Sequence, residues 1–169
     1  MPGSDARSRR RARQPAVHAA GARAGASGLI DAARQARLSS LADFSGFAVG
    51  AALETSTGEI VTGCNIENAT YGLTMCAERV ALFKALSEGH RAFRRVAVVS
   101  DAPVATPPCG ACRQVLWEFG GDLEVVMANL QRETARVRLR ALLPLPFTRR
   151  SLTGAPRPRA RRRKRSNPL

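Results

Sequence analysis

The sequence lacks any long apolar run. No hydrophobic stretch approaches the roughly 18 residues that a membrane-spanning helix needs, which excludes an integral membrane protein. The first residues also lack the apolar segment of a secretory signal, and we therefore expect a cytoplasmic protein. In a reducing compartment, the four cysteines of the chain favour a metal site over disulfide bonds.

Acidic residues are the second deficit, with 13 Asp and Glu against 27 Lys and Arg and a net charge of +14. A chain this basic suggests a nucleic-acid binder, but the excess charge is confined to the two ends. Residues 1–27 carry a net charge of +5 and residues 148–169 a net charge of +9, so residues 28–147 are neutral. The charge of the chain therefore says little about the function of its middle.

Both ends are poor in large apolar residues. Residues 1–27 contain no Leu, Ile or Phe, and residues 148–169 combine prolines with a run of basic residues at 161–165. Such segments cannot bury enough apolar surface to offset the entropy of ordering. We expect two disordered basic tails, 1–27 and 148–169, around one catalytic domain of residues 28–147. A non-specific contact of the tails with nucleic acid is one hypothesis, and plain solvated tails are the other.

The middle of the chain shows the periodicities of an α/β domain. Helically spaced apolar residues and β-branched runs alternate, separated by glycines and prolines. The predicted helices cover residues 29–38, 76–88 and 110–119, and the predicted strands cover residues 47–53, 60–64, 96–99, 123–127 and 136–139. Strands that alternate with helices favour a layered α/β fold.

Three cysteines stand at the starts of predicted helices. Cys-Ala-Glu occupies residues 76–78 and Pro-Cys-Gly-Ala-Cys occupies residues 108–112. Cys109 and Cys112 are three residues apart, so both sulfurs can face one point, and the unpaired N–H groups of a helix start stabilise thiolates. Three thiolates predict one zinc ion per chain with a fourth coordination position left open, whereas structural zinc sites usually have four protein ligands. The remaining cysteine, Cys64, lies in an apolar strand, which favours a buried thiol over a ligand.

An open position admits a water molecule, whose pKa zinc can lower to about 7. Glu78 follows Cys76 by two residues and is close enough to take a proton from that water, although a carboxylate in a first helical turn is also explained by the helix dipole. Arg79 and Arg113 each directly follow a site residue, and both are predicted to donate hydrogen bonds to the thiolates. For Arg113 an ordinary surface role is an equally good interpretation.

These motifs resemble those of the zinc nucleobase deaminases, in which Cys-x-x-Cys ligands accompany an activated water and a Glu that is not a ligand. With Cys-x-Glu in place of His-x-Glu, the chain is similar to the small cytidine deaminases of pyrimidine nucleoside salvage. The resemblance covers most of residues 28–147, and its motifs stand in family order at residues 47–53, 63–72, 76–79, 100–101, 108–116, 142–144 and 147.

The resemblance implies a three-layer α-β-α domain with a mixed five-stranded sheet, assembled as a homotetramer. It also implies hydrolysis of cytidine and 2′-deoxycytidine to uridine and 2′-deoxyuridine with release of ammonia. Zinc would be held by Cys76, Cys109 and Cys112, with Glu78 as the proton shuttle. The implied substrate contacts are Phe47 and Ala77 at the pyrimidine, Asn65 and Glu67 at the ribose hydroxyls, Tyr71 in the same substrate loop, and Phe147 from a neighbouring subunit.

Three other functions stay open on the sequence alone. A polynucleotide-editing deaminase fits the basic tails, but a carboxylate at Glu67 accepts from a free 3′-hydroxyl and not from a phosphodiester. Deamination of another aminopyrimidine, such as a cytosine-derived antibiotic, fits the zinc motif equally well. A zinc-stapled nucleic-acid-binding module needs a closed four-ligand site and has no use for Glu78.

Overall fold

The computed structural model describes residues 26–153 of the chain. In this part no helix is long and apolar enough to cross a membrane. The elements are α1 (Ala26–Arg37), β1 (Val49–Thr55), β2 (Ile60–Cys64), the 3₁₀ helix η1 (Tyr71–Leu73), α2 (Ala77–Ser87), β3 (Phe93–Ser100), α3 (Gly110–Gly120), β4 (Glu124–Ala128), β5 (Glu133–Arg138), α4 (Leu139–Leu142) and α5 (Arg149–Thr153).

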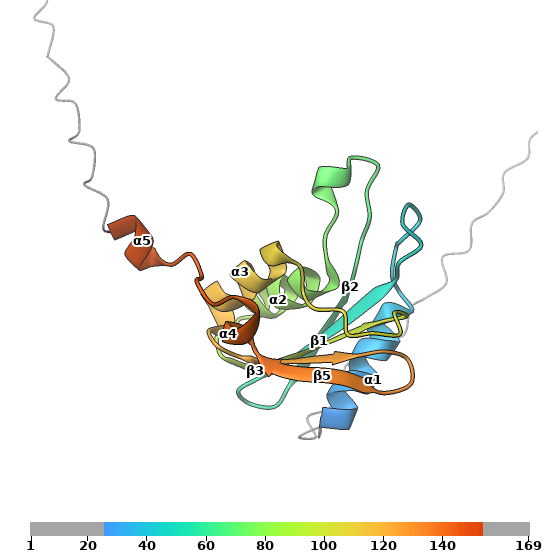
Figure 1. Cartoon of the computed structure of the whole chain (residues 1–169), viewed down its shortest axis with the longest axis horizontal. Helices are drawn as coiled ribbons and strands as arrows, with labels where there is room; N and C mark the ends of the chain where they lie inside the picture. Colours follow the sequence, from blue (N-terminus) through green and yellow to red (C-terminus); the bar gives the residue numbers. More distant parts are fainter. Residues whose placement is uncertain (1–25, 154–169) are drawn as a thin grey trace, which may run out of the picture.

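Five strands form one mixed sheet in the order β2-β1-β3-β4-β5 (Figure 1). The β3–β4 pair is parallel, and the other three pairs are antiparallel. The predicted hairpin is confirmed, because β1 and β2 pair around a turn in which Gly58 has a φ of 97°. The mixed five-stranded sheet that the resemblance implied is therefore present.

Helices cover both faces of the sheet. Leu29, Ile30 and Ala33 of α1 pack on one face against small and β-branched side chains such as Ala97 and Val99 of β3. On the other face, α2 and α3 pack with alanines and leucines against the opposite side chains of the same strands. The alternation along each strand thus supplies two apolar faces, as three layers require.

Two glycines let helices approach the sheet closely. A Cβ atom on Gly50 of β1 would lie 2.0 Å from the carbonyl oxygen of Ala33 in α1. A Cβ atom on Gly63 of β2 would lie 2.5 Å from the amide nitrogen of Ala81 in α2. Both contacts are with backbone atoms, which cannot rotate away. The two glycines therefore set how near α1 and α2 lie to the strands that line the site.

The predicted tails lie mostly outside the described residues, and the described ends differ from the prediction. Helix α1 begins at Ala26, and residues 149–153 form the short helix α5. An ion pair joins Arg149 to Glu118 of α3 over 3.6 Å, and Leu152 lines a shallow hollow that Phe119 and Phe147 also line. These contacts with α3, which are distant in the sequence, give residues 149–153 partners that composition does not reveal.

We predict that Gly50→Ala destabilises the protein, because its methyl group would overlap the backbone of α1. Overpacking of this kind costs about 1–3 kcal/mol or more in the free energy of unfolding. Gly72→Ala is the matched control, since a Cβ atom there meets nothing within 4 Å, and it should change stability by less than about 0.5 kcal/mol. Urea denaturation of both variants measures the difference, and equal midpoints would contradict the close approach of α1.

Candidate metal centre and active site

Three cysteine sulfurs meet where two helices begin. Cys76 is the N-cap residue of α2, Cys109 is the N-cap residue of α3, and Cys112 lies one turn into α3. All three Sγ atoms lie within 4.8 Å of one another, and those of Cys76 and Cys109 are 3.7 Å apart. Tetrahedral zinc with Zn–S bonds of about 2.3 Å holds two sulfurs about 3.8 Å apart. The cluster therefore fits zinc in both donor type and spacing.

Cys64 does not join this cluster. It belongs to β2, and its thiol donates a hydrogen bond to the carbonyl oxygen of Ser39 over 3.1 Å. Partial burial raises the pKa of the Cys64 thiol, which disfavours a thiolate. Within residues 26–153, the metal-binding group of three or more candidate side chains consists of Cys76, Cys109 and Cys112, so a position remains for a non-protein ligand.

A positively charged side chain, that of Arg79, lies beside the sulfurs. Arg79, in the first turn of α2, donates from Nη2 to Cys76 Sγ over 3.5 Å and to the carbonyl oxygen of Thr74 over 3.2 Å. A hydrogen bond from Cys112, with the help of Arg79, holds the pKa of Cys76 down at about 5. The same shared proton raises the pKa of Cys112, which is buried. The Nε atom of Arg79 is buried without a hydrogen-bond partner.

Arg113 was predicted to donate a hydrogen bond to a thiolate, but in the structure it donates to backbone carbonyl groups. Its Nε donates to the carbonyl oxygen of Pro108 over 2.6 Å, and its Nη1 donates to that of Leu142 over 2.9 Å. The side chain turns toward these backbone acceptors because Leu142, at the end of α4, lies beside the start of α3. Arg113 thus supports the segment that leads into Cys109.

Glu78 is the second residue of α2 and is 5% exposed. Burial raises the pKa of its carboxyl group to about 7, against the opposing effects of its own backbone N–H and of Cys112. A carboxyl group that titrates near neutrality can both accept and return a proton. The position beside three thiols, and not the helix dipole alone, therefore makes Glu78 a candidate general acid–base.

A cavity of about 250 Å³ opens beside the cluster. It brings together several predicted site residues, namely Phe47, Asn65, Glu67, Cys76, Ala77, Glu78 and Cys109. Sequence reasoning missed Ser45, Val49, Thr74, Val98, Thr106 and Pro107, which line the same cavity. The two valines have the pattern of ordinary core residues, and nearness to Cys109 was the one local signal for Thr106 and Pro107.

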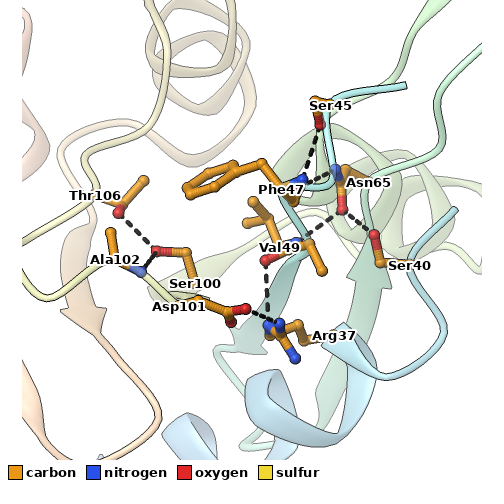
Figure 2. Close-up of polar contacts among 11 residues, drawn as sticks. Arg37, Ser40, Ser45, Phe47, Val49, Asn65, Ser100, Asp101, Ala102 and Thr106 are labelled. Atoms are coloured by element: carbon orange, nitrogen blue, oxygen red, sulfur yellow. Dashed lines mark hydrogen bonds and ion pairs between the residues drawn. The ribbon is translucent and has the colours of Figure 1, made fainter. Parts of the chain in front are cut away.

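The Asn65 side chain is engaged with the backbone around the cavity. Its Oδ1 accepts from the N–H of Val49 over 2.8 Å and from the hydroxyl of Ser40, and its Nδ2 donates to the carbonyl oxygen of Phe47 over 2.9 Å (Figure 2). One of its two amide N–H groups is used by this last bond. Asn65 thus holds Phe47 in place and keeps a second donor.

The Glu67 carboxylate holds the loop before Phe47. It accepts from the backbone N–H groups of Phe44 and Ser45 over 2.8 and 3.0 Å, and from the hydroxyl of Ser45. These hydrogen bonds, chiefly those of Ser45, lower the pKa of Glu67. At neutral pH the group is therefore an anion that accepts hydrogen bonds and cannot donate one.

Tyr71 and Phe147 lie outside this cavity. Tyr71 is 73% exposed and packs edge-on against Phe44, with the ring centroids 5.6 Å apart. Phe147 is also exposed, and its backbone N–H and carbonyl are both bonded to the Gln114 side chain over 3.0 and 2.8 Å. Tyr71 lines an adjoining hollow that shares Ser45, Glu67 and Thr74 with the cavity. Phe147, which was predicted to act from a neighbouring subunit, lines a separate hollow beside α3.

A layered α/β domain that gathers three cysteines and a buried carboxylate at two helix starts defines a zinc-binding hydrolase domain. Residues 26–129 match the sequence model of a family described as the cytidine and deoxycytidylate deaminase zinc-binding region. The chain belongs to this family.

Relatives of known name agree with the family. A protein named cytidine deaminase from Halalkalibacterium halodurans is 50% identical over 121 residues, covering 71% of this chain and 92% of that protein. A probable cytidine deaminase from Dictyostelium discoideum is 47% identical, covering 73% and 84%. The crystal structure of cytidine deaminase from Burkholderia pseudomallei superposes with a TM-score of 0.71 at 47% identity, covering 73% of this chain and all of that one.

We predict one zinc ion per chain, held by the three-cysteine cluster. Cys109→Ala should lose most of the metal, because two remaining thiolates bind zinc weakly. Cys64→Ala is the matched control and should keep one zinc per chain, since Cys64 bonds Ser39 and lies outside the cluster. Elemental analysis of the purified variants measures this. Equal metal loss from Cys64→Ala would mean a closed four-cysteine site.

Proposed function

We propose that this protein is an enzyme of pyrimidine salvage that hydrolyses cytidine and 2′-deoxycytidine to uridine and 2′-deoxyuridine, releasing ammonia. One observation carries the proposal. The cavity that contains Cys76, Cys109 and Glu78 also contains Asn65 and Glu67, so a zinc site and hydroxyl-binding groups share one small space. The names of the relatives support the same substrate.

The chemistry divides between the metal and Glu78. Zinc held by Cys76, Cys109 and Cys112 supplies a Lewis acid that makes an attacking water molecule acidic near neutral pH. The carboxylate of Glu78 takes one proton of that water, whose oxygen adds to C4 of the cytosine ring, and delivers the proton to N3. Glu78 then takes the second proton, that of the new C4 hydroxyl, and passes it to the amino group at C4. The C4–N bond breaks, ammonia leaves and the C4 carbonyl group of uridine forms. Burial favours this shuttle because it raises the pKa of Glu78 to about 7. A group with a pKa near the working pH can both accept a proton and give it back.

Arg79 balances the charge of the site. Three thiolates around a divalent cation leave a net negative charge, which opposes ionisation of water. The guanidinium of Arg79 already bonds Cys76 and draws electron density from the sulfur. The first turns of α2 and α3 add their N–H dipoles at the same point.

Asn65 and Glu67 select a nucleoside. The spare amide N–H of Asn65 can donate to a ribose hydroxyl, and a carboxylate has about four acceptor positions, of which Glu67 uses three. The anionic Glu67 favours a hydroxyl donor and repels a phosphate. Phe47, which is held by Asn65, and Ala77 provide the apolar surface for the pyrimidine.

The assembly and setting of the enzyme belong to the same proposal. A homotetramer would cover exposed apolar side chains such as Phe83, Tyr71 and Phe147, and Phe147 would then reach a neighbouring subunit's cavity. A cytoplasmic location suits three thiols that must stay reduced to bind metal. The basic ends of the chain would give weak, salt-sensitive contacts with nucleic acid that are independent of sequence.

We predict that Glu78→Gln abolishes turnover and keeps the metal. The amide preserves the volume and hydrogen-bonding capacity of the side chain but cannot accept the water proton, so kcat should fall by about 10²–10⁴-fold or more. Glu88→Gln, at the C-terminal end of the same helix, is the control and should retain the parent rate. Uridine formation and zinc content measure both. A folded, zinc-loaded Glu78→Gln that works within about tenfold of the parent would refute the shuttle.

We predict a strong preference for the free nucleoside. Cytidine and deoxycytidine should react far faster than cytosine, which lacks the ribose that Asn65 and Glu67 bind. Cytidine 3′-phosphate should be a poor substrate, because its anion faces the Glu67 carboxylate. Comparison of kcat/KM for these four compounds tests this. Equal values for cytidine and its 3′-phosphate would remove Glu67 from substrate binding.

A further inference from the structure

Two walls of the cavity leave the sheet at one point. The antiparallel pairing of β1 and β3 ends with Val49 opposite Ser100. Beyond this pair the two segments of the polypeptide separate. One runs back through Ala48 to Phe47, and the other runs on through Asp101 to residues 106–109. Both Phe47 and Thr106 line the cavity. The distance between these two segments of the polypeptide therefore sets the width of the substrate site.

Arg37 links these two segments just beyond the last paired residues of β1 and β3. Its Nε donates to the carbonyl oxygen of Ala48 over 3.2 Å, and its Nη2 makes an ion pair with the carboxylate of Asp101 (Figure 2). Ala48 precedes Val49, and Asp101 follows Ser100. A single guanidinium thus bridges the residues that flank the final pair of the ladder.

The placement of Arg37 follows from the packing of α1. Arg37 is the last residue of that helix, and Gly50 lets its backbone approach β1 so closely that a Cβ atom there would lie 2.5 Å from the amide nitrogen of Arg37. The Arg37 side chain is 15% exposed and that of Asp101 is 50% exposed. The planar guanidinium offers several donors in a fixed geometry, which suits two acceptors on different segments of the polypeptide.

Each wall is also braced internally. The hydroxyl of Ser100 bonds that of Thr106 over 2.7 Å and accepts from the N–H of Ala102, which folds the second wall onto the end of β3. On the first wall, Asn65 holds the carbonyl of Phe47. Figure 2 shows the Phe47 ring directed across the gap toward Thr106.

We propose that Arg37, through Asp101, is a positioning residue that sets the distance between Phe47 and Thr106 and thereby the fit of the pyrimidine. The inference rests on the proposed function, because the fit is measured with cytidine. Arg37 lines neither the cavity nor the metal cluster, so its effect should be on binding of the substrate and not on the chemical step.

The test compares Arg37→Met with Arg34→Met in the full-length protein. Arg34 is a matched control on the same helix, since it also donates from Nε to a backbone carbonyl, that of Asn129, and pairs with one carboxylate, that of Asp31. Neither of these partners lines the cavity. We expect Arg37→Met to raise KM for cytidine by about tenfold with kcat within about threefold, the pattern of lost uniform binding. Arg34→Met should leave both constants unchanged.

Two further measurements separate positioning from general loss of stability. Asp101→Asn removes the ion pair at a half-exposed side chain and should raise KM in the same way, and it decides the matter if Arg37→Met does not fold. The double variant should be no worse than the poorer single variant, because both substitutions break one interaction. Discrimination against 5-methylcytidine should also fall in both single variants, as a wider cavity admits the added methyl group.

The outcomes are distinct. If the parent deaminates cytidine and the Arg37 and Asp101 variants keep its KM and its discrimination, the positioning role is refuted and the proposed function stands. If the two substitutions change KM additively, they act independently and the bridge is refuted. If the zinc-loaded parent does not deaminate cytidine, the proposed function and this inference both fall.

Discussion

Three sulfurs lie close together beside a buried carboxylate, and so much potential negative charge is stable only where positive charge is concentrated at the same point. Here α2 and α3 both begin at the cluster, with Cys76 and Cys109 as their N-cap residues. The positive ends of both helix dipoles therefore lie at the thiols, and Arg79 adds a full charge beside Cys76. Placing two helix starts together is thus the condition on which the site depends.

That condition determines much of the architecture. Helix α2 lies so close to β2 that only glycine fits at position 63, and α3 is attached to the α4 segment through Arg113. The parallel β3–β4 pair requires a crossover, and α3 provides it, so the loop that enters α3 at Cys109 lies at the carboxyl end of β3. Parallel strands of an α/β sheet form ligand sites at this end, and the cavity lies there.

Secondary structure was predictable wherever the pattern was local. The helices at 76–88 and 110–119 match α2 and α3 within about a residue at each end. Strand β3 begins three residues before the predicted start, because the polar Arg95 pairs with Glu54 of β1. Strand β5 was misplaced toward its C-terminal end, since it is an edge strand with charged side chains outward and Leu139 already belongs to α4.

Local patterns were enough to predict the candidate zinc ligands, their spacing and a candidate acid–base residue, because Cys-x-Glu and Cys-x-x-Cys act over a single helical turn whose geometry is the same in any protein. Tertiary structure decided which side chains serve the protein's own backbone. Arg113 turned to carbonyl groups, Glu67 to the loop at Phe44 and Ser45, and Arg37 to a carboxylate 64 residues away. A long polar or aromatic side chain takes the partners that packing brings within reach, and no local pattern records which distant segment that packing will supply.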